Sequence, residues 1–339
     1  MQRLPAPPSS ATRRRLLAQA AALAAFPVSA LAQSRSAAPA TPKAAPVGAL
    51  RIFIPANAGG GWDQTGRALG AALLACGAAE KVDYENLGGK GGTIGLARYV
   101  ERYDAAPNAL LIGGAVMVGA VALQKPAVDL SRVQPLARLT SDYLAVVVPT
   151  ASPLHNAKDL VAALRADMAG QVFAGGSAGG VDHMFAGVLT RAAKAPPEKL
   201  VYKPFPGGAE VVDALLKGEA TVGISGYSEF SAAIGAGKLR AIGLSARRSL
   251  FGLPSFREQG VDADMANWRG VFTGKQVPPA RAQALLAALE QATQHASWQR
   301  TLQQNRWESS WLAGRNLDDF LEMDLTTARV MAYLLKLKG

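Results

Sequence analysis

The sequence predicts an α/β protein with two lobes, each built on a parallel sheet. One unit recurs along the chain: a short apolar strand, a glycine-rich loop and a helix with an apolar stripe. Strands that alternate with helices of this length form parallel sheets with helical crossovers. A chain of 339 residues also exceeds the comfortable size of one core, and its 35 glycines and 20 prolines suit many tight turns. We therefore expect two lobes.

The first 32 residues have the three parts of an export signal. Arginines at 13–15 precede an apolar run from Leu16 to Ala25, and the small residues of Ala30–Ala32 follow. A membrane-spanning helix needs about 20 apolar residues, so the run predicts a cleaved signal peptide, residues 1–32, rather than an anchor. The adjacent arginines leave twin-arginine export and ordinary secretion both open. Residues 33–48 are rich in Ala, Pro and Ser and predict a flexible tether.

Three units predict the first lobe, beginning near Ala49. They read ALRIFIPANAGGGWDQTGRALGAALLACG, VDYENLGGKGGTIGLARYVERY and ALLIGGAVMVGAVAL. Two helices close the chain, PPARAQALLAALEQATQ and LDDFLEMDLTTARVMAYLLKL, and we expect them to pack on the existing sheet.

Three further units predict the second lobe. They read VFAGGSAGGVDHMFAGVLTRAA, LVYKPFPGGAEVVDALLKGEA and TVGISGYSEFSAAIGAGK. We expect the chain to leave the first lobe near Val146 and to return near Leu244. The predicted first lobe is therefore residues 49–145 plus 245–339, and the second is residues 146–244.

The glycine loops predict a site for an anion. In parallel sheets, ligands bind at the carboxyl ends of the strands, where the following helices begin. A helix N-terminus offers free backbone N–H groups and about half a positive charge. Several such ends on two facing lobes would hold a carboxylate or a phosphate.

Other kinds of site find little support. The formal net charge of +11 includes four arginines and no acid in residues 1–32, so the mature chain carries +7, and no basic cluster with interleaved aromatics predicts nucleic-acid binding. Cys76 is the single cysteine and fits a helical apolar stripe. His155 and His295 show no metal-ligand spacing with each other or with His183, and GGTIG at 91–95 lacks the dinucleotide fingerprint. We expect no cofactor and no metal.

The order of the motifs resembles a known family. PANAGGGWDQTGRAL, ENLGGKGGTIGLA, GGSAGGVDHM, YKPFPGGAEVVDALLKGEATVGISGYSEF, AGKLRAIGLSA and NWRGVF follow one another as in the periplasmic receptors of tripartite tricarboxylate transporters, also called Bug receptors. The resemblance covers residues 49–336, and MVGA and NWRG resemble the tricarboxylate-receptor branch. It implies a type II periplasmic binding fold, with two lobes joined by two crossing strands that close on a small carboxylated ligand.

The resemblance also implies the residues that bind the ligand. In the family, glycine loops of both lobes hold carboxylates through backbone amides, water and a few side chains. The corresponding positions here are, in the first lobe, Gly59, Gly60, Gly61, Trp62, Asp63, Gly91, Gly92 and Thr93, and, in the second lobe, Ser177, Ala178, Gly180, His183, Phe205, Gly207, Gly208, Ser225 and Tyr227. Lys90 and the apolar run at 115–117 depart from many relatives, so the ligand's identity transfers least.

Several of these residues have a structural alternative. Asp63 fits an ordinary first-turn acid as well as a ligand contact, and Trp62 fits a loop anchor as well as a cover over the ligand. Ser177, Asp182 and His183 do not form a catalytic relay by their spacing. We read Glu229 as a first-turn acid.

Arg269 in NWRG has two equal readings. It is either a charge-assisted partner for a second carboxylate or one member of a fixed ion pair that braces the hinge.

The leading hypothesis is a receptor and not an enzyme. It would capture a small di- or tricarboxylate in the periplasm as a monomer and deliver it to the membrane permease. One alternative is an exported two-lobed enzyme acting on an anionic substrate, against which stands the lack of a defensible base, nucleophile or metal set. Another is a receptor that presents its ligand to a sensor.

Overall fold

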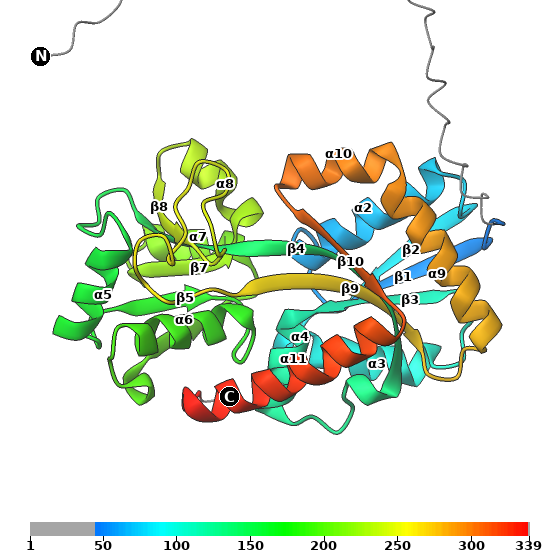
Figure 1. Ribbon diagram of the computed structural model, residues 1–339, viewed down its shortest axis with the longest axis horizontal. Coiled ribbons are helices and arrows are strands. Elements are labelled where there is room, and N and C mark those ends of the chain that lie inside the picture. Colours follow the sequence, from blue (N-terminus) through cyan, green and yellow to red (C-terminus); the bar gives the residue numbers. More distant parts are fainter. Residues whose placement is uncertain (1–44, 338–339) are drawn as a thin grey trace, which may run out of the picture. The chain divides into compact units, whose positions relative to one another are not determined.

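The computed structural model describes residues 45–337 (Figure 1). The predicted signal peptide and residues 33–44 of the predicted tether lie outside the described residues. Val47, near the end of that tether, is already buried, and its backbone N–H donates to the carbonyl of Ala78. The alternation of strands and helices confirms the predicted α/β class.

The first lobe is the part built on three parallel strands in the order β2-β1-β3. Its strand–helix units are β1 (Ala49–Ile54) with α2 (Gly61–Ala75), β2 (Lys81–Asn86) with α3 (Thr93–Tyr103), and β3 (Ala109–Gly114) with α4 (Ala115–Gln124). Ile52, Phe53 and Ile54 are all fully buried, because helices cover both faces of this sheet (Figure 1). A continuous apolar strand such as ALRIFI is typical of that setting.

The second lobe is the part built on three parallel strands in the order β7-β5-β6. Its units are β5 (Val172–Gly175) with α6 (Val181–Ala192), β6 (Val201–Pro204) with α7 (Gly208–Leu216), and β7 (Val222–Gly226) with α8 (Tyr227–Gly235), to which α5 (Ala157–Ala166) and β8 (Leu239–Leu244) are added. In both lobes, then, the carboxyl ends of parallel strands lead directly into helix starts.

One long strand connects the two sheets. β4 (Val133–Pro149) pairs antiparallel with β9 (Ala266–Gly274) and β10 (Glu308–Ala313) up to Tyr143, and with β7 and β8 from Leu144 onward. The antiparallel β4 and β9 are the two strands at the junction of the lobes. The lobe bounds that we predicted from the sequence remain a prediction.

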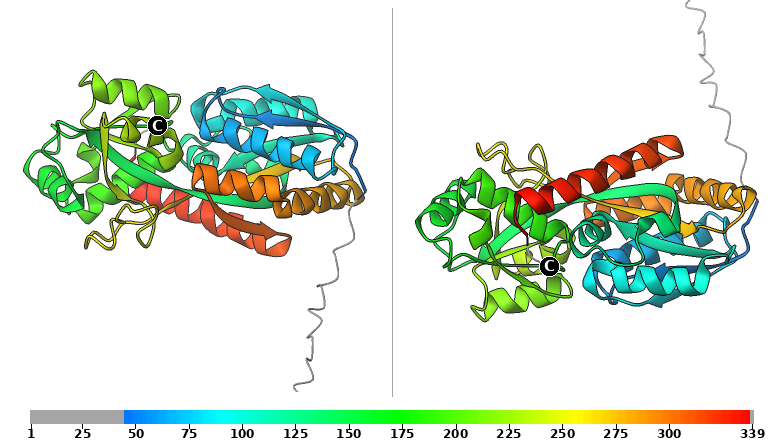
Figure 2. Two further views of the ribbon diagram at one scale, coloured as in Figure 1. Left: turned by 90° about the horizontal axis from the view of Figure 1, so that it is seen from above. Right: turned by 90° about the horizontal axis from the view of Figure 1, so that it is seen from below.

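The last part of the chain adds more than the two predicted helices. α9 (Pro279–Gln294) and α11 (Arg315–Leu334) lie where we predicted them, and between them are α10 (Ala296–Asn305) and β10, which we did not predict. α2, α9 and α10 cover one face of the first-lobe sheet, and α3, α4 and α11 cover the other (Figure 1). α11 runs on toward the second lobe (Figure 2), where Leu335 lies against Gly187 of α6. Within residues 45–337, no helix is both long and apolar enough to cross a membrane.

Candidate ligand-binding site

The six strand–helix units share one kind of helix start. Each helix follows a glycine N-cap, and no side chain caps any of the six. These N-caps are Gly60, Gly92, Gly114, Gly180, Gly207 and Gly226. By contrast, the side chains of Asn156 and His295 cap α5 and α10. The six helix starts therefore keep backbone N–H groups for a partner from outside the helix, as an anion site requires.

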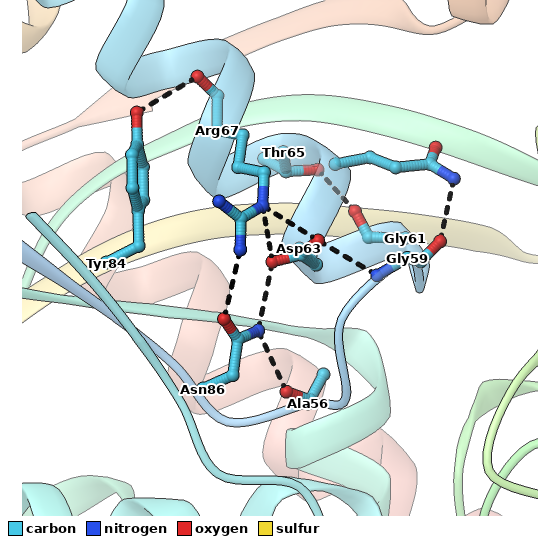
Figure 3. A network of polar contacts seen from close by, with 9 residues as sticks. Ala56, Gly59, Gly61, Asp63, Thr65, Arg67, Tyr84 and Asn86 are labelled. Carbon is cyan, nitrogen blue, oxygen red and sulfur yellow. Dashed lines mark hydrogen bonds and ion pairs between the residues drawn. The ribbon is translucent and has the colours of Figure 1, made fainter.

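Asp63 holds the loop before α2 together (Figure 3). Gly59 has a φ of +86°, and its N–H donates to Asp63 Oδ2 at 2.9 Å. Arg67 Nε donates to both carboxylate oxygens at 3.0 Å, and Asn86 Nδ2 donates to Oδ1 at 2.9 Å. Burial alone would raise the pKa of Asp63, but these hydrogen bonds and the Arg67 charge outweigh it and lower the pKa. Of our two readings, the contacts favour the structural acid.

Trp62 is buried and joins two of the predicted loops. A Cβ atom on Gly92 would lie 2.6 Å from Cζ3 of the Trp62 ring, so glycine lets the ring pack directly on the loop before α3. Thr93 also turns inward, because its hydroxyl donates to the Lys90 carbonyl and contacts Gln124 Oε1. These contacts favour the loop anchor over a ligand cover for Trp62, while Lys90 itself is exposed.

The loop before α6 repeats this arrangement with other side chains. Gly179 has a φ of +79°, and its N–H donates to His183 Nδ1 at 3.1 Å. The His183 ring stacks on Tyr202 with 4.1 Å between centroids, and burial lowers the pKa of His183 to about 4. The neutral ring accepts at Nδ1 and so carries its proton on Nε2, which has no partner within the described chain. His183 thus keeps one donor for a ligand.

Asp182, beside His183, is a second loop-holding acid. Its Oδ2 accepts from the Gly176 N–H at 2.7 Å. Burial and the negative charges of Glu229 and Asp142 raise the pKa of Asp182 to about 7, against the Gly176 hydrogen bond. As predicted from spacing, Asp182 is no relay partner for His183, whose Nδ1 is held by Gly179.

The two lobes meet at Glu229 in the first turn of α8. Its Oε1 accepts from the N–H of Gly61, the first residue of α2, at 2.8 Å, and its Oε2 accepts a short hydrogen bond from Ser225 Oγ. A Cβ atom on Gly208 would lie 2.5 Å from Glu229 Cβ. The starts of α2, α7 and α8 therefore converge on one carboxylate. Sequence reasoning missed this contact, because it joins residues 168 positions apart.

Arg269 lies directly behind this point. Its Nη2 is 2.8 Å from Asp142 Oδ2, its Nη1 donates to Thr65 at 3.1 Å, and its guanidinium carbon lies 4.7 Å from the centre of the Trp307 ring. Arg269 and Asp142 are 2% and 1% exposed, and they come from β9 and β4, the strands at the junction. Of the two readings of Arg269, the structure favours the ion pair that braces the hinge. Burial raises the pKa of Asp142 to about 6, against the Arg269 charge.

A second contact between the lobes brings together the remaining glycine loops. Gln124 Nε2 of α4 donates to the Lys90 carbonyl at 3.1 Å and to the Ala178 carbonyl at 3.4 Å. A Cβ atom on Gly91 would lie 3.5 Å from that of Ser177. Four predicted positions of both lobes, Gly91, Ser177, Ala178 and Gly180, therefore lie along α4, from Val116 near its start to Gln124 at its end.

Two predicted residues have other neighbours. The Tyr227 hydroxyl accepts from Arg306 Nη1 at 2.7 Å, and the Arg306 guanidinium lies over the rings of Tyr227 and Phe251. Phe205 is half-buried against the smaller apolar cluster of the second lobe. Tyr227 therefore contributes to contact between the lobes. Among the described contacts, neither Tyr227 nor Phe205 binds the Glu229 carboxylate.

Two grooves on the described surface lie elsewhere. The first, of about 600 Å³, is lined by the end of α4 and by α11, and the second, of about 570 Å³, by α10 and its neighbours. No predicted site residue lines either groove. Among residues 45–337, no three His, Cys, Asp or Glu side chains gather as a metal site would need.

Solved structures of other proteins have this fold. The periplasmic binding protein BugD is 20% identical with a TM-score of 0.76, over 87% of this chain and 99% of that chain. MatC from Rhodopseudomonas palustris with bound malate is 21% identical with a TM-score of 0.72, over 85% and 99%. R. palustris Rpa4515 with adipate is 17% identical with a TM-score of 0.77, over 86% and 99%. These likenesses confirm the two-lobed type II periplasmic binding fold.

The sequence itself gives the family. No curated protein sequence matches the chain. A family model described as tripartite tricarboxylate transporter family receptor, TctC, matches residues 74–331. Because that match spans most of the chain, with every one of the six helix starts except that of α2, the protein belongs to the receptor family of the tripartite tricarboxylate transporters.

Proposed function

We propose that the protein is a periplasmic solute receptor that captures a small di- or tricarboxylate between its lobes and delivers it to the permease of a tripartite tricarboxylate transporter. The observation that carries the proposal is the carboxylate of Glu229, bound by the Gly61 N–H and the Ser225 hydroxyl where three helices begin. The two donors that hold the Glu229 carboxylate could hold a ligand carboxylate in its place. The malate and adipate bound to MatC and Rpa4515 support the same ligand class.

Binding would rely on helix starts more than on basic side chains. Arg269 is committed to Asp142 and Arg67 to Asp63, so neither cation is available as a simple counter-ion. The uncapped starts of α2, α3 and α4 in one lobe and of α6, α7 and α8 in the other supply N–H donors instead. His183 Nε2 adds a neutral donor.

Capture is a shift between two arrangements of the lobes. A ligand that touches helix starts of both lobes binds the closed arrangement more tightly than the open one, so it raises the closed population. The closed form with ligand bound is then the one that a permease would recognise. A monomer suffices for this cycle, and the predicted signal peptide would place it in the periplasm.

A thermal-shift screen tests the proposal. The chain without residues 1–32 is unfolded, freed of small molecules, refolded and tested with mono-, di- and tricarboxylates, amino acids and inorganic phosphate. A ligand at a hundredfold excess over its Kd stabilises the native state by about 2.7 kcal/mol, which a melting curve resolves. We expect shifts with di- or tricarboxylates. If phosphate or amino acids alone shift the curve, the proposed ligand class is wrong.

A further inference from the structure

Glu229 differs from the other acids that begin helices in this protein. Asp63 and Asp159 accept from backbone N–H groups four residues away, within their own loops. Glu229 instead reaches across to the other lobe and accepts from Gly61, 168 residues away. Its carboxylate is therefore a physical link between the lobes and not simply a compensating charge on its own helix.

The surroundings of Glu229 are shaped for this position. Gly208 is the first residue of α7, and a Cβ atom there would lie 2.5 Å from Glu229 Cβ and 2.6 Å from Oε2. A Cβ atom on Gly61 would lie 3.3 Å from Oε1 and 2.7 Å from Arg269 Nη2. Both residues begin helices with ordinary helical backbone, so neither needs glycine for its backbone conformation. Glycine is needed at Gly208 because Glu229 lies too close for a side chain, and at Gly61 because Glu229 and Arg269 do.

The charges nearby decide whether a ligand joins Glu229 or replaces it. Arg269, the buried cation here, is paired with Asp142, and Asp182 is close enough for the Glu229 charge to raise its pKa. A ligand carboxylate added beside Glu229 would place one more negative charge in this buried acidic group, without a new cation. A ligand carboxylate that takes the place of the Glu229 carboxylate brings one negative charge into this group as the Glu229 charge moves out of it. It also uses the same two donors, the Gly61 N–H and the Ser225 hydroxyl.

We propose that Glu229 is a tethered competitor of the ligand: it occupies the carboxylate position at the start of α2, latches the lobes together, and gives up the Gly61 N–H and the Ser225 hydroxyl when a ligand carboxylate enters. The inference rests on the proposed carboxylate-binding function. It makes Glu229 a specificity-determining residue, because only a ligand that satisfies both donors, one in each lobe, replaces the latch without loss.

The competition has a measurable size. If the latch holds about 90% of the molecules, only the remaining tenth binds ligand, and the apparent Kd is about tenfold weaker than the intrinsic one. Glu229→Ala removes the latch, and Glu229→Gln keeps the size of the side chain while it removes the charge. Asp213→Asn is the matched control, because it removes one charge from an exposed position on α7 in the same lobe.

The test combines small-angle X-ray scattering with calorimetry on the chain without residues 1–32, using malate and adipate as probes. We expect the ligand-free wild type and Asp213→Asn to have the smaller radius of gyration, and Glu229→Ala to be larger until a probe is added. We also expect both Glu229 variants to bind the probes several-fold to tenfold more tightly than the wild type.

Two results would overturn the inference. Equal radii of gyration for the ligand-free wild type and Glu229→Ala would mean that Glu229 is no latch. Weaker binding by both Glu229 variants would mean that Glu229 contacts the ligand rather than competing with it. If no carboxylate binds to any of the proteins, the proposed function fails, and the scattering comparison still decides whether Glu229 latches the lobes.

Discussion

The loops before α2 and α6 have the same backbone in the two lobes. Gly59 and Gly179 have φ values of +86° and +79°, and the N-caps that follow, Gly60 and Gly180, are both extended. The third helical residue of each then accepts a hydrogen bond from the N–H of the positive-φ glycine. Because a side chain at φ near +80° is strained, glycine is the residue that this turn requires.

The side chains in these two matching places have opposite electrical roles. Asp63 is a charged acceptor balanced by Arg67, whereas His183 is a neutral ring with a donor to spare. The first-lobe loop therefore pairs its acid with a cation, whereas the second-lobe loop offers a neutral donor beside Asp182, an acid with a pKa raised to about 7. Similar glycine patterns thus form the same turn in both lobes, and the third helical residue, Asp63 or His183, decides whether that turn carries a charge.

The largest expected effect concerns Arg269, the buried cation behind the start of α2. Arg269→Met leaves Asp142 buried without its partner, and we expect a loss of about 3–5 kcal/mol in the free energy of unfolding. Arg269→Met combined with Asp142→Leu removes both charges and should recover most of that loss. Urea unfolding measures both. A loss below about 1 kcal/mol in the single variant would show that the pair does not brace the junction.

The matched N-cap glycines give the next comparison. A Cβ atom on Gly180 would lie 2.9 Å from the Ser177 carbonyl and 3.3 Å from Val116, whereas one on Gly60 meets no atom closer than 3.6 Å. Both substitutions replace an N-cap glycine by alanine, which is less favourable at an N-cap by the same amount. The difference between their losses of stability therefore measures the crowding around Gly180. We expect Gly180→Ala to cost about 1–3 kcal/mol more than Gly60→Ala in urea unfolding. Equal costs would show that the loop before α6 relieves this crowding without loss of stability.

The two loop acids should respond to pH in opposite directions. The pKa of Asp182 is raised to about 7, so between about pH 4 and 7 the folded state keeps a proton that the unfolded state has released. Its contribution to stability therefore falls as pH rises through that window, by at most about 1.4 kcal/mol per unit. The lowered pKa of Asp63 makes its contribution present above its ordinary value of 3.8 and lost below its folded pKa.

Thermal unfolding from pH 4 to 8 compares Asp182→Asn and Asp63→Asn as differences from the wild type. We expect Asp182→Asn to gain on the wild type as pH rises, and Asp63→Asn to be less stable by about 1–2 kcal/mol at pH 7 because it loses charge-assisted hydrogen bonds. The His183 contribution, which rises with pH between about 4 and 6.5, is common to all three proteins and cancels. Parallel curves for the two variants would contradict the assigned pKa directions.

How far the sequence predicts this molecule depends on the range of the contacts. The helix starts at Gly60, Gly180 and Gly207 are predictable, because a glycine loop after an apolar strand is a local signal. The position of Asp63 in the first turn of its helix can be predicted from the sequence. Its hydrogen bond with Asn86 cannot, because Asn86 comes from another strand. The link from Glu229 to Gly61 and the ion pair of Arg269 with Asp142 join residues more than 120 positions apart, and no local pattern contains them. α10 and β10 were not predicted, because residues 296–313 are largely polar and α10 buries only Trp298 and Leu302.

The central claim is that backbone N–H groups at glycine helix starts hold the ligand's carboxylates. Its most direct test is calorimetric titration of the best carboxylate from the screen into the wild type, Gly60→Val and Gly207→Val. A Cβ atom at either glycine has room, with nearest neighbours at 3.6 Å and 3.5 Å, so both variants should fold. We expect their circular dichroism to match the wild type and their affinity to fall by about a hundredfold or more, roughly 2.7 kcal/mol. Wild-type affinity in a folded variant would contradict the claim.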